Sequence, residues 1–349
     1  MKIYIEASSF YGNRTGVGRY GLSISEALIK LRPNDQFVLF SFLRPGRQIN
    51  LDFELPSNAK RKFIRWFPGR AFSLLMRKGL GLPLELFGLG SADVIFFPNF
   101  IAWPSLTNKN RLSVVHDVSF LYQPEFVQAK NLKYLTTQLP KSLRRSKAVA
   151  AVSEATKKDL VQIKTSPDKI TVVPNAVDHN IFSPVASNQT TQTIKKLGIP
   201  NSYLLFVGTV EPRKNIEGLL EAFAQSYPQH KLPLVIVGGK GWNDEGIERK
   251  LKDLASLPIY RTDFVSDLDL AALYAGATAF VYPSFYEGFG IPVLEAMACG
   301  CPVVCSNNSA FPEVVGDAAL QVNASSIADI AAAINKVASS VDLRKQMSS

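Results

Sequence analysis

Cysteine and histidine are scarce in this chain, with three of each among 349 residues. Cys299, Cys301 and Cys305 lie within seven positions of one another, without the spacing of a zinc site and without a histidine nearby. Buried free cysteines behave as small hydrophobic side chains. We therefore expect these three to be buried in a core, and not to be metal ligands or disulfide partners.

Long hydrophobic runs are also missing, because no apolar stretch reaches the roughly 18 to 20 residues that a membrane helix needs. The sequence enters a strand pattern at Lys2, without a signal peptide, which predicts a cytoplasmic protein. Hydrophobic residues make up 46% and charged residues 19%, which is typical of a globular protein and excludes a disordered one. A chain of this length predicts two domains.

Acidic residues are sparse in the first half of the chain. Residues 1–182 hold 26 Lys+Arg against 13 Asp+Glu, whereas the remainder holds 13 against 16, so the net charge of +10 is entirely N-terminal. Residues 60–78 contain seven cations, no acid and several aromatic side chains. This composition favours contact with an anionic membrane surface. A solvated basic face with aromatic side chains packed beneath it remains an alternative, and no nucleic-acid-binding motif is present.

Strand patterns alternate with helix patterns along the whole chain, which predicts an α/β protein with mostly parallel, doubly wound sheets. A polar segment at 183–193 reads as a linker, so that residues 1–182 and 194–349 form two Rossmann-like domains facing a central cleft. Ser153 is the expected N-cap of one helix. The expected strands are 2–6, 37–42, 62–66, 93–97, 112–115, 148–152, 170–173, 203–207, 234–237, 259–263 and 279–282. The first expected helix follows the glycine loop that ends at Gly21 and runs to about Leu31. The other expected helices cover 71–78, 131–145, 153–163, 215–223, 244–255 and 268–275.

A glycine-rich loop joins the strand 279–282 to a helix that opens near Gly290, with Pro292 in its first turn. Backbone N–H groups at such a helix start form a ready site for anions and hydroxyls. Glu287 in the loop and Glu295 in the helix are too far apart to act as the carboxylate pair of a hydrolase. They suit contacts with two parts of one long ligand, although two solvated acids are the alternative.

Arg213 and Lys214 precede another helix, where their charges oppose the helix dipole. This misfit is explained if an anion binds between them. Two solvated charges are the alternative, and Asn215 is a candidate cap. A second candidate, His116, follows the strand 112–115 at the edge where ligands bind in doubly wound sheets, and both a structural and a functional role are open for it.

The pattern Gly16-Val-Gly18-Arg-Tyr-Gly21 matches the dinucleotide-binding fingerprint in letters. However, about nine residues separate it from the first strand, and no acid follows the second strand. A dehydrogenase is therefore disfavoured.

Taken together, these motifs closely resemble those of family 4 retaining glycosyltransferases, and the resemblance covers nearly the whole chain. It includes the Glu-x7-Glu signature from Glu287 to Glu295, the following Pro-Val-Val strand, Glu-Pro-Arg-Lys-Asn before the helix at 215, Val-Val-His-Asp-Val around His116, and 173–184. Two departures are Thr209, where many members have arginine, and the end of the chain at 342–349, where members continue into a helix that crosses back to the first domain.

The resemblance implies a GT-B fold and assigns roles to named residues. Arg213 and Lys214 would hold the diphosphate of the donor, Glu287 the sugar hydroxyls, Glu295 both ribose hydroxyls, and His116 would orient the sugar. Gly16 would lie near the diphosphate. The remaining residues expected around the donor are Gly208, Gly288, Phe289, Gly290 and Leu294.

The implied activity is transfer of a hexose from a nucleotide diphosphate sugar, with no metal or other cofactor required. The sequence leaves UDP-hexose and GDP-mannose equally open as donors. Similarity to bacterial polysaccharide-assembly mannosyl- and glucosyltransferases suggests a saccharide or lipid-linked saccharide acceptor, and residues 60–78 suggest a peripheral position at the inner face of the cell membrane. The alternatives are a nucleotide-sugar epimerase of the same fold and a non-catalytic nucleotide-sugar-binding subunit.

Overall fold

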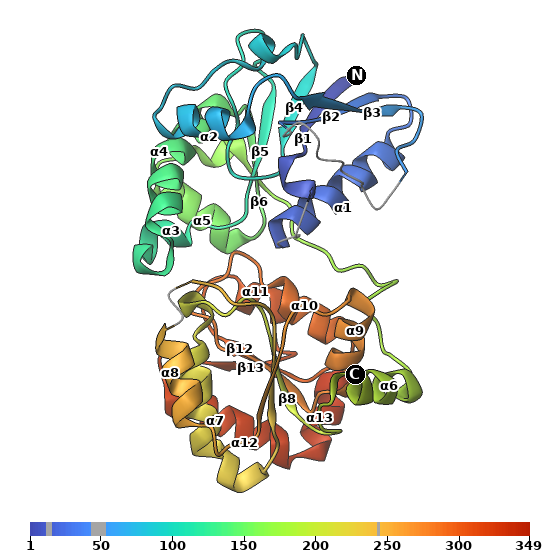
Figure 1. Cartoon of the computed structure of the whole chain (residues 1–349), viewed down its shortest axis with the longest axis vertical. Helices are drawn as coiled ribbons and strands as arrows, with labels where there is room; N and C mark the ends of the chain where they lie inside the picture. The colour runs from blue at the N-terminus through green and yellow to red at the C-terminus, as the bar shows by residue number, and fades with distance from the viewer. Residues whose placement is uncertain (12–15, 43–53, 243–244) are drawn as a thin grey trace. The chain divides into compact units, whose positions relative to one another are not determined.

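The computed structural model describes residues 1–11, 16–42, 54–242 and 245–349. The chain divides into two compact units, Met1–Pro174 and Asn175–Ser349, each built around its own parallel sheet (Figure 1). Within the described residues, no helix has both the length and the apolar character that crossing a membrane requires.

The N-terminal unit contains a seven-stranded sheet in the order β3-β2-β1-β4-β5-β6-β7, in which each strand pairs in parallel with its neighbours. Its strands are β1 (Lys2–Glu6), β2 (Gln36–Phe42), β3 (Ala59–Ile64), β4 (Val94–Phe97), β5 (Arg111–Val115), β6 (Ala148–Ala151) and β7 (Ile170–Val172). Its α-helices are α1 (Gly16–Leu31), α2 (Gly69–Arg77), α3 (Ser119–Tyr122), α4 (Ala129–Arg145) and α5 (Glu154–Gln162).

The C-terminal unit repeats the arrangement with six strands in the order β10-β9-β8-β11-β12-β13. Its strands are β8 (Leu204–Val207), β9 (Leu234–Val237), β10 (Ile259–Thr262), β11 (Ala279–Tyr282), β12 (Val303–Ser306) and β13 (Leu320–Val322). Its α-helices are α6 (Ser187–Leu197), α7 (Ile216–His230), α8 (Glu245–Asp253), α9 (Asp267–Gly276), α10 (Ile291–Ala298), α11 (Phe311–Val315), α12 (Ile327–Ser339) and α13 (Val341–Ser348).

The central strands are continuous apolar runs because helices cover both faces of a parallel sheet. All four residues of each of β8, β9, β11 and β12 are buried. Cys299, Cys301 and Cys305 belong to this core, as expected, and are free thiols. Ser153 caps α5 as expected, since its side chain accepts a hydrogen bond from the Thr156 N–H.

Two expectations about chain organisation differ from the structure. Residues 187–197 form α6, so the segment 183–193 is largely helical instead of a linker, and the units divide at Pro174 instead of at 182. The polar composition of α6 is misleading because the helix buries one narrow face, including Thr193 and Ile194. Lys196 adds an ion pair to Asp269 of α9.

Smaller differences concern element ends. Strand β3 runs over 59–64 and not over 62–66, because its cationic first half pairs with β2 in register, Lys60 opposite Val38. Asp244, the expected first residue of one helix, lies outside the described residues. Asn215 stands in the N-cap position of α7 but makes no side-chain capping bond; its amide donates to the carbonyls of Pro283 and Ala324 instead.

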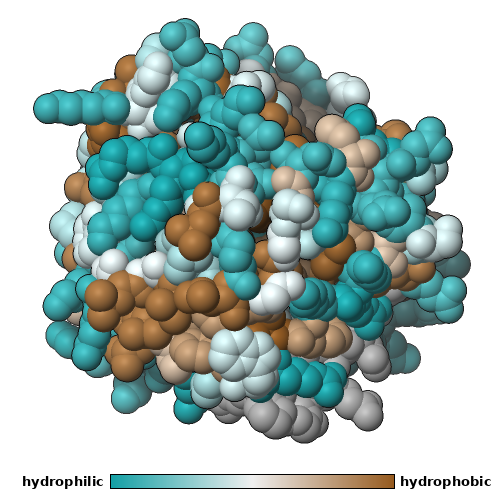
Figure 2. Space-filling model, turned by 90° about the horizontal axis from the view of Figure 1, so that it is seen from above, coloured by the Kyte–Doolittle hydropathy of each residue, from teal (hydrophilic) through white to brown (hydrophobic). Residues whose placement is uncertain are grey.

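The segment 60–78 contains both buried and exposed apolar side chains. Phe72 and Met76 of α2 are buried beneath the surface, whereas Trp66 and Leu74 are 68% and 54% exposed. Figure 2 shows a face of the molecule on which hydrophobic side chains gather in a band among hydrophilic ones.

Candidate functional site

The strand order of the C-terminal unit predicts where a ligand binds. The chain reverses its winding direction between β8 and β11, which are paired neighbours. In open doubly wound sheets, ligands bind beyond the carboxyl ends of the strands at this switch point. The loop after β8 begins at Gly208 and contains Arg213 and Lys214, and the loop after β11 contains Glu287.

Charged side chains from these two loops form one buried cluster. Arg213 Nη1 lies 3.0 Å from Glu287 Oε2, and its Nη2 lies 2.8 Å from Glu211 Oε1. Lys214 Nζ is in contact with Glu287 Oε1 and donates to the Tyr282 hydroxyl at 2.5 Å. Lys214 and Glu287 are only 9% and 8% exposed. Two cations and two carboxylates thus balance in a site that excludes most water.

The cluster controls the protonation of its members. Burial alone would raise the pKa of Glu287, but the Arg213 and Lys214 charges outweigh this and lower the pKa to about 2. Burial, together with the neighbouring Arg213 charge, lowers the pKa of Lys214 from its ordinary value, while the Glu287 charge opposes this. Glu287 is therefore a carboxylate over the whole physiological range.

Backbone contacts fix the two loops to each other. The Phe285 N–H donates to the Arg213 carbonyl at 2.9 Å, and the Ser284 hydroxyl donates to the same carbonyl at 3.2 Å. The Glu287 N–H donates to the Ser309 hydroxyl at 3.0 Å. The positions of Arg213 and Glu287 are therefore set by the scaffold as well as by their own attraction.

Glycines allow the backbone to close around this region. Gly290 has φ +97° and stands in the N-cap position of α10, where a Cβ would lie 2.7 Å from the Phe311 ring. A Cβ on Gly238, after β9, would lie 2.2 Å from the Gly208 carbonyl oxygen. Pro292 stands in the first turn of α10, as the sequence predicts, and the helix begins at Ile291. The first N–H groups of α10 therefore follow directly on the loop that carries Glu287.

Glu295 lies on the same helix but makes a separate contact. It is 5% exposed and accepts a hydrogen bond from the Tyr274 hydroxyl of α9 at 3.1 Å. Leu294 and Phe289 are half-buried, and Gly288 is buried. The structure thus separates Glu287, which binds the cations, from Glu295, which binds a tyrosine one turn or more into the helix.

His116 lies in the N-terminal unit, directly after β5. It is buried, and its Nε2 is 2.8 Å from the Pro98 carbonyl oxygen, so Nε2 carries the proton because a carbonyl can only accept. The rings of Tyr20 and Phe100 pack edge-on against the His116 ring, with centroid-to-centroid distances of 4.9 Å and 5.4 Å. Burial lowers the pKa of His116, which keeps the ring neutral near pH 7.

The three glycines of the dinucleotide-like pattern, Gly16, Gly18 and Gly21, all lie within helix α1 instead of in a loop between a strand and a helix. Gly16 begins α1 and is exposed, and no atom of the described residues lies within 4 Å of the position that a Cβ would take. Gly21 is buried within α1, where a Cβ would lie 2.6 Å from the Phe10 ring. The third glycine is therefore explained by packing of α1 against the segment that follows β1.

Several residues at these sites escaped the sequence analysis. Tyr282, Ser284 and Glu211 all contact the charged cluster, and Tyr274 contacts Glu295. Tyr282 reads as an apolar strand residue in the sequence, and Glu211 as part of a surface turn. Their proximity to Arg213 and Glu287 in the sequence was the only signal that could have marked them.

Within the described residues, no three His, Cys, Asp or Glu side chains gather in a group that could hold a metal ion.

Two doubly wound parallel-sheet units, with buried cations at the switch point of the second, define a GT-B protein. Solved structures agree with this fold: the chain superposes on sucrose-phosphate synthase from Thermosynechococcus elongatus with a TM-score of 0.73 at 18% identity, covering 100% of this chain and 92% of that one. Anabaena HepE in complex with UDP-glucose gives a TM-score of 0.71 at 16% identity, with the same two coverages.

Sequence comparison then gives the family. Residues 14–181 match the family model for Glycosyltransferase Family 4, and residues 189–349 match the model for Glycosyl transferases group 1. The O-antigen chain mannosyltransferase B of Escherichia coli is 33% identical over an alignment 351 positions long, which covers 96% of this chain and 90% of that protein. The chain belongs to the family 4 glycosyltransferases and is a glycosyltransferase.

Proposed function

We propose that this protein transfers mannose from GDP-mannose to a saccharide or lipid-linked saccharide during polysaccharide assembly, with retention of the anomeric configuration. The choice of mannose is supported by the identity to a mannosyltransferase over nearly the whole chain. The choice of a diphosphate donor is supported by the cluster of Arg213, Lys214 and Glu287.

The cluster is suited to a leaving group that gains negative charge. Departure of the nucleoside diphosphate places charge on its terminal phosphate, and buried cations stabilise that charge more strongly than they would in water. Arg213 and Lys214 are fixed in position before the reaction, so no reorganisation is needed when the charge develops. The N–H groups at the start of α10 supply further donors without a metal ion.

Glu287 anchors the two cations and is available to the sugar hydroxyls through its remaining lone pairs. A covalent mechanism would need a free carboxylate as nucleophile. Glu287 does not fit that role, because both cations and the hydroxyls of Tyr282 and Ser284 contact it and its pKa is lowered to about 2. Front-face transfer, assisted by the departing phosphate, agrees better with this arrangement.

Glu295 and His116 are each assigned a contact with the donor in this proposal. Glu295 binds the ribose hydroxyls, with its carboxylate oriented by Tyr274. Neutral His116 offers Nδ1 as an acceptor to a sugar hydroxyl, because its Nε2 proton is committed to Pro98.

The direct test is incubation of the protein with GDP-mannose or UDP-glucose, with and without a mannose-terminated oligosaccharide. The proposal predicts GDP release and a new α-mannoside, seen by NMR, only when GDP-mannose and acceptor are both present. Faster turnover of UDP-glucose would overturn the choice of donor. Conversion of the donor alone into another sugar would indicate an epimerase, and absence of any turnover would indicate a binding subunit.

A matched pair of variants ties this activity to the cluster. Lys214→Gln should lower kcat by about 100-fold, as loss of one donor to a developing charge does. Lys250→Gln removes a cation from an exposed ion pair with Glu221 and should leave kcat unchanged. Equal activity of both variants would contradict the proposed role of Lys214.

A further inference from the structure

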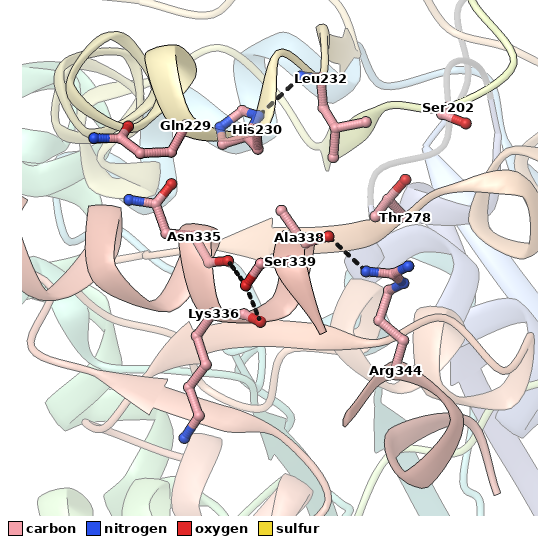
Figure 3. A pocket seen from close by; sticks show the side chains of 10 residues that line it. All are labelled: Ser202, Gln229, His230, Leu232, Thr278, Asn335, Lys336, Ala338, Ser339 and Arg344. Carbon is pink, nitrogen blue, oxygen red and sulfur yellow. Dashed lines mark hydrogen bonds between the residues drawn. The ribbon is translucent and has the colours of Figure 1, made fainter. Parts of the chain in front are cut away.

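Each unit has a cavity at the amino ends of its strands, away from the carboxyl ends described above. The cavity of the C-terminal unit has a volume of about 590 Å³ and lies beside the last turns of α7 and α12 (Figure 3). Arg344 donates there to the carbonyls of Val337 and Ala338, so its charge satisfies the end of α12. The cavity of the N-terminal unit, about 530 Å³ in volume, is lined by Gly79, Arg111, Lys141, Arg144 and Arg145. The contacts that bear on the proposed donor site are at the other ends of the strands.

The segment that follows β12 contacts both ends of residues 283–290, the loop after β11, which we call the acidic loop. β11 and β12 are paired, so the segments that follow them are neighbours. The Ser306 hydroxyl donates to the Ser284 carbonyl at 2.7 Å, near the start of the acidic loop. At the end of the loop, the Phe311 ring lies so close to Gly290 that a Cβ there would be 2.7 Å from it. Both ends of the acidic loop are therefore fixed.

Ser309 contacts the middle of the acidic loop. Its hydroxyl oxygen accepts a hydrogen bond from the Glu287 N–H at 3.0 Å. The same hydroxyl lies 3.3 Å from the Asn308 side-chain oxygen and donates to it. The hydroxyl proton thus points to Asn308, which leaves a lone pair of the oxygen for the Glu287 N–H.

The peptide group between Tyr286 and Glu287 is bonded on both sides. Its N–H donates to Ser309, and its carbonyl oxygen accepts from Arg213 Nη1 at 2.6 Å. Because a peptide group is planar, fixing the direction of its N–H also fixes the direction of its carbonyl. Ser309 therefore acts on the Arg213 guanidinium through one rigid peptide group.

The backbone of Ser309 is in the left-handed region, with φ +49°. Residues with a Cβ avoid this region, whereas glycine occupies it at little cost. Residues held in such conformations concentrate at functional sites, where the surrounding structure keeps them in place. Glycine would suit this backbone better than serine does, so what serine adds is its hydroxyl.

We propose that Ser309 is a positioning residue for the donor: its hydroxyl fixes the peptide between Tyr286 and Glu287, and this peptide directs Arg213 toward the diphosphate. The inference rests on the proposed function, in which Arg213 binds that diphosphate. Donors that are fixed before charge develops stabilise it most, because they need no reorganisation during the reaction. Without the hydroxyl, the peptide group is free to rotate and Arg213 loses its fixed direction.

The test compares Ser309→Gly with Ser309→Ala, because both remove the hydroxyl but only glycine relieves the left-handed backbone. Ser309→Ala should therefore melt about 2 to 4 °C below Ser309→Gly. Calorimetry with GDP and UDP should show that both variants bind the preferred nucleoside diphosphate about 10-fold more weakly than the parent. The affinity for the corresponding monophosphate should stay the same. Binding of the diphosphate thus follows the hydroxyl and not the stability of the fold.

Each other pattern of affinities would overturn the role of Ser309. A loss in Ser309→Ala alone would assign the effect to backbone strain, and a loss in Ser309→Gly alone would assign it to added flexibility. An equal loss for diphosphate and monophosphate would show a general disturbance of the site. Parent-like affinity in both variants would show that the hydroxyl has no effect on the donor.

Lys231→Gly is the matched control for the glycine substitution. Lys231 is exposed, has φ +54° and stands in the C-cap position of α7, at the opposite end of that helix from Asn215. Its replacement should leave the affinity for GDP and UDP within about 2-fold of the parent value. A loss equal to that of Ser309→Gly would show that glycine loosens the unit as a whole, and would contradict positioning by Ser309.

Hydrogen exchange of the free protein tests the contact itself, without nucleotide or transfer. The Glu287 amide should exchange about 10-fold faster in Ser309→Ala than in the parent, because its acceptor is gone. Unchanged exchange would overturn the inference. Failure of the parent to bind either GDP or UDP would contradict the proposed function together with the inference, whereas normal binding by the parent and both Ser309 variants would contradict the inference alone.

Discussion

Lys214 and Glu287 form a buried ion pair although they stand 73 positions apart in the chain. The pair joins the loop after β8 to the loop after β11, and it exists because these strands are neighbours in the sheet. The pair fixes a cation where the proposed function requires one. It should also affect the stability of the fold and the pH dependence of that stability.

The first prediction concerns stability. Glu287→Gln leaves the buried Arg213 and Lys214 without their shared countercharge, which should lower the free energy of unfolding by about 3 to 5 kcal/mol at pH 7. Glu248→Gln, which breaks a partly exposed pair with Arg261, should cost about 1 kcal/mol or less. Urea denaturation measures both. A similar loss of unfolding free energy in both variants would show that removing Glu287 leaves no destabilising charge on Arg213 and Lys214.

The second prediction concerns pH. The folded-state pKa of Glu287 is about 2, below its unfolded value of 4.5. Its contribution to the free energy of unfolding is therefore fully present above pH 4.5 and is lost as pH falls toward 2. The stability difference between the parent protein and Glu287→Gln should therefore shrink by about 3 kcal/mol over this range. Glu85, whose pKa is also lowered to about 2, is present in both proteins, so its pH-dependent contribution to stability cancels in the difference. A difference that stays constant with pH would be inconsistent with the ion pair.

The fold was accessible from the sequence because the apolar strands are continuous and their spacing is regular. The charged pairing was not accessible, since only the order of β8 and β11 in the sheet brings Glu287 to Lys214. α6 was missed because its polar face dominates the composition of 187–197. The cavity lined by Arg111 and Arg145 was missed for a related reason, because the two residues come from separate elements and meet only in the folded unit.

The third prediction concerns Glu295. Glu295→Gln should weaken binding of the nucleoside diphosphate about 10- to 100-fold, because a charge-assisted contact to the ribose hydroxyls is lost. Tyr274→Phe keeps the Glu295 carboxylate and removes only the hydroxyl that orients it, so the affinity for the nucleoside diphosphate should fall less. Calorimetric titration reports both affinities. A lower melting temperature with unchanged affinity would show that Glu295 serves only to bind Tyr274.

The fourth prediction concerns His116. His116→Phe keeps an aromatic ring against Tyr20 and Phe100 but removes the acceptor nitrogen, so kcat should fall about 100-fold while donor affinity changes less than about 3-fold. In the parent protein, the lowered pKa of His116 predicts no loss of activity from its protonation until the pH falls below 6.5. Steady-state kinetics with a pH series checks both statements. A fall in donor affinity with unchanged kcat would contradict this role.

The central claim is that Arg213 and Lys214 bind the terminal phosphate of the nucleoside diphosphate, and the affinity difference between GDP and GMP tests it most directly. Calorimetry on the parent protein and on Lys214→Gln should show that GDP binds the parent at least about 10-fold more tightly than GMP, and that most of this ratio is lost in the variant. Affinity for GMP should stay the same in both. An unchanged GDP-to-GMP ratio in Lys214→Gln, in a protein that remains folded, would contradict the account.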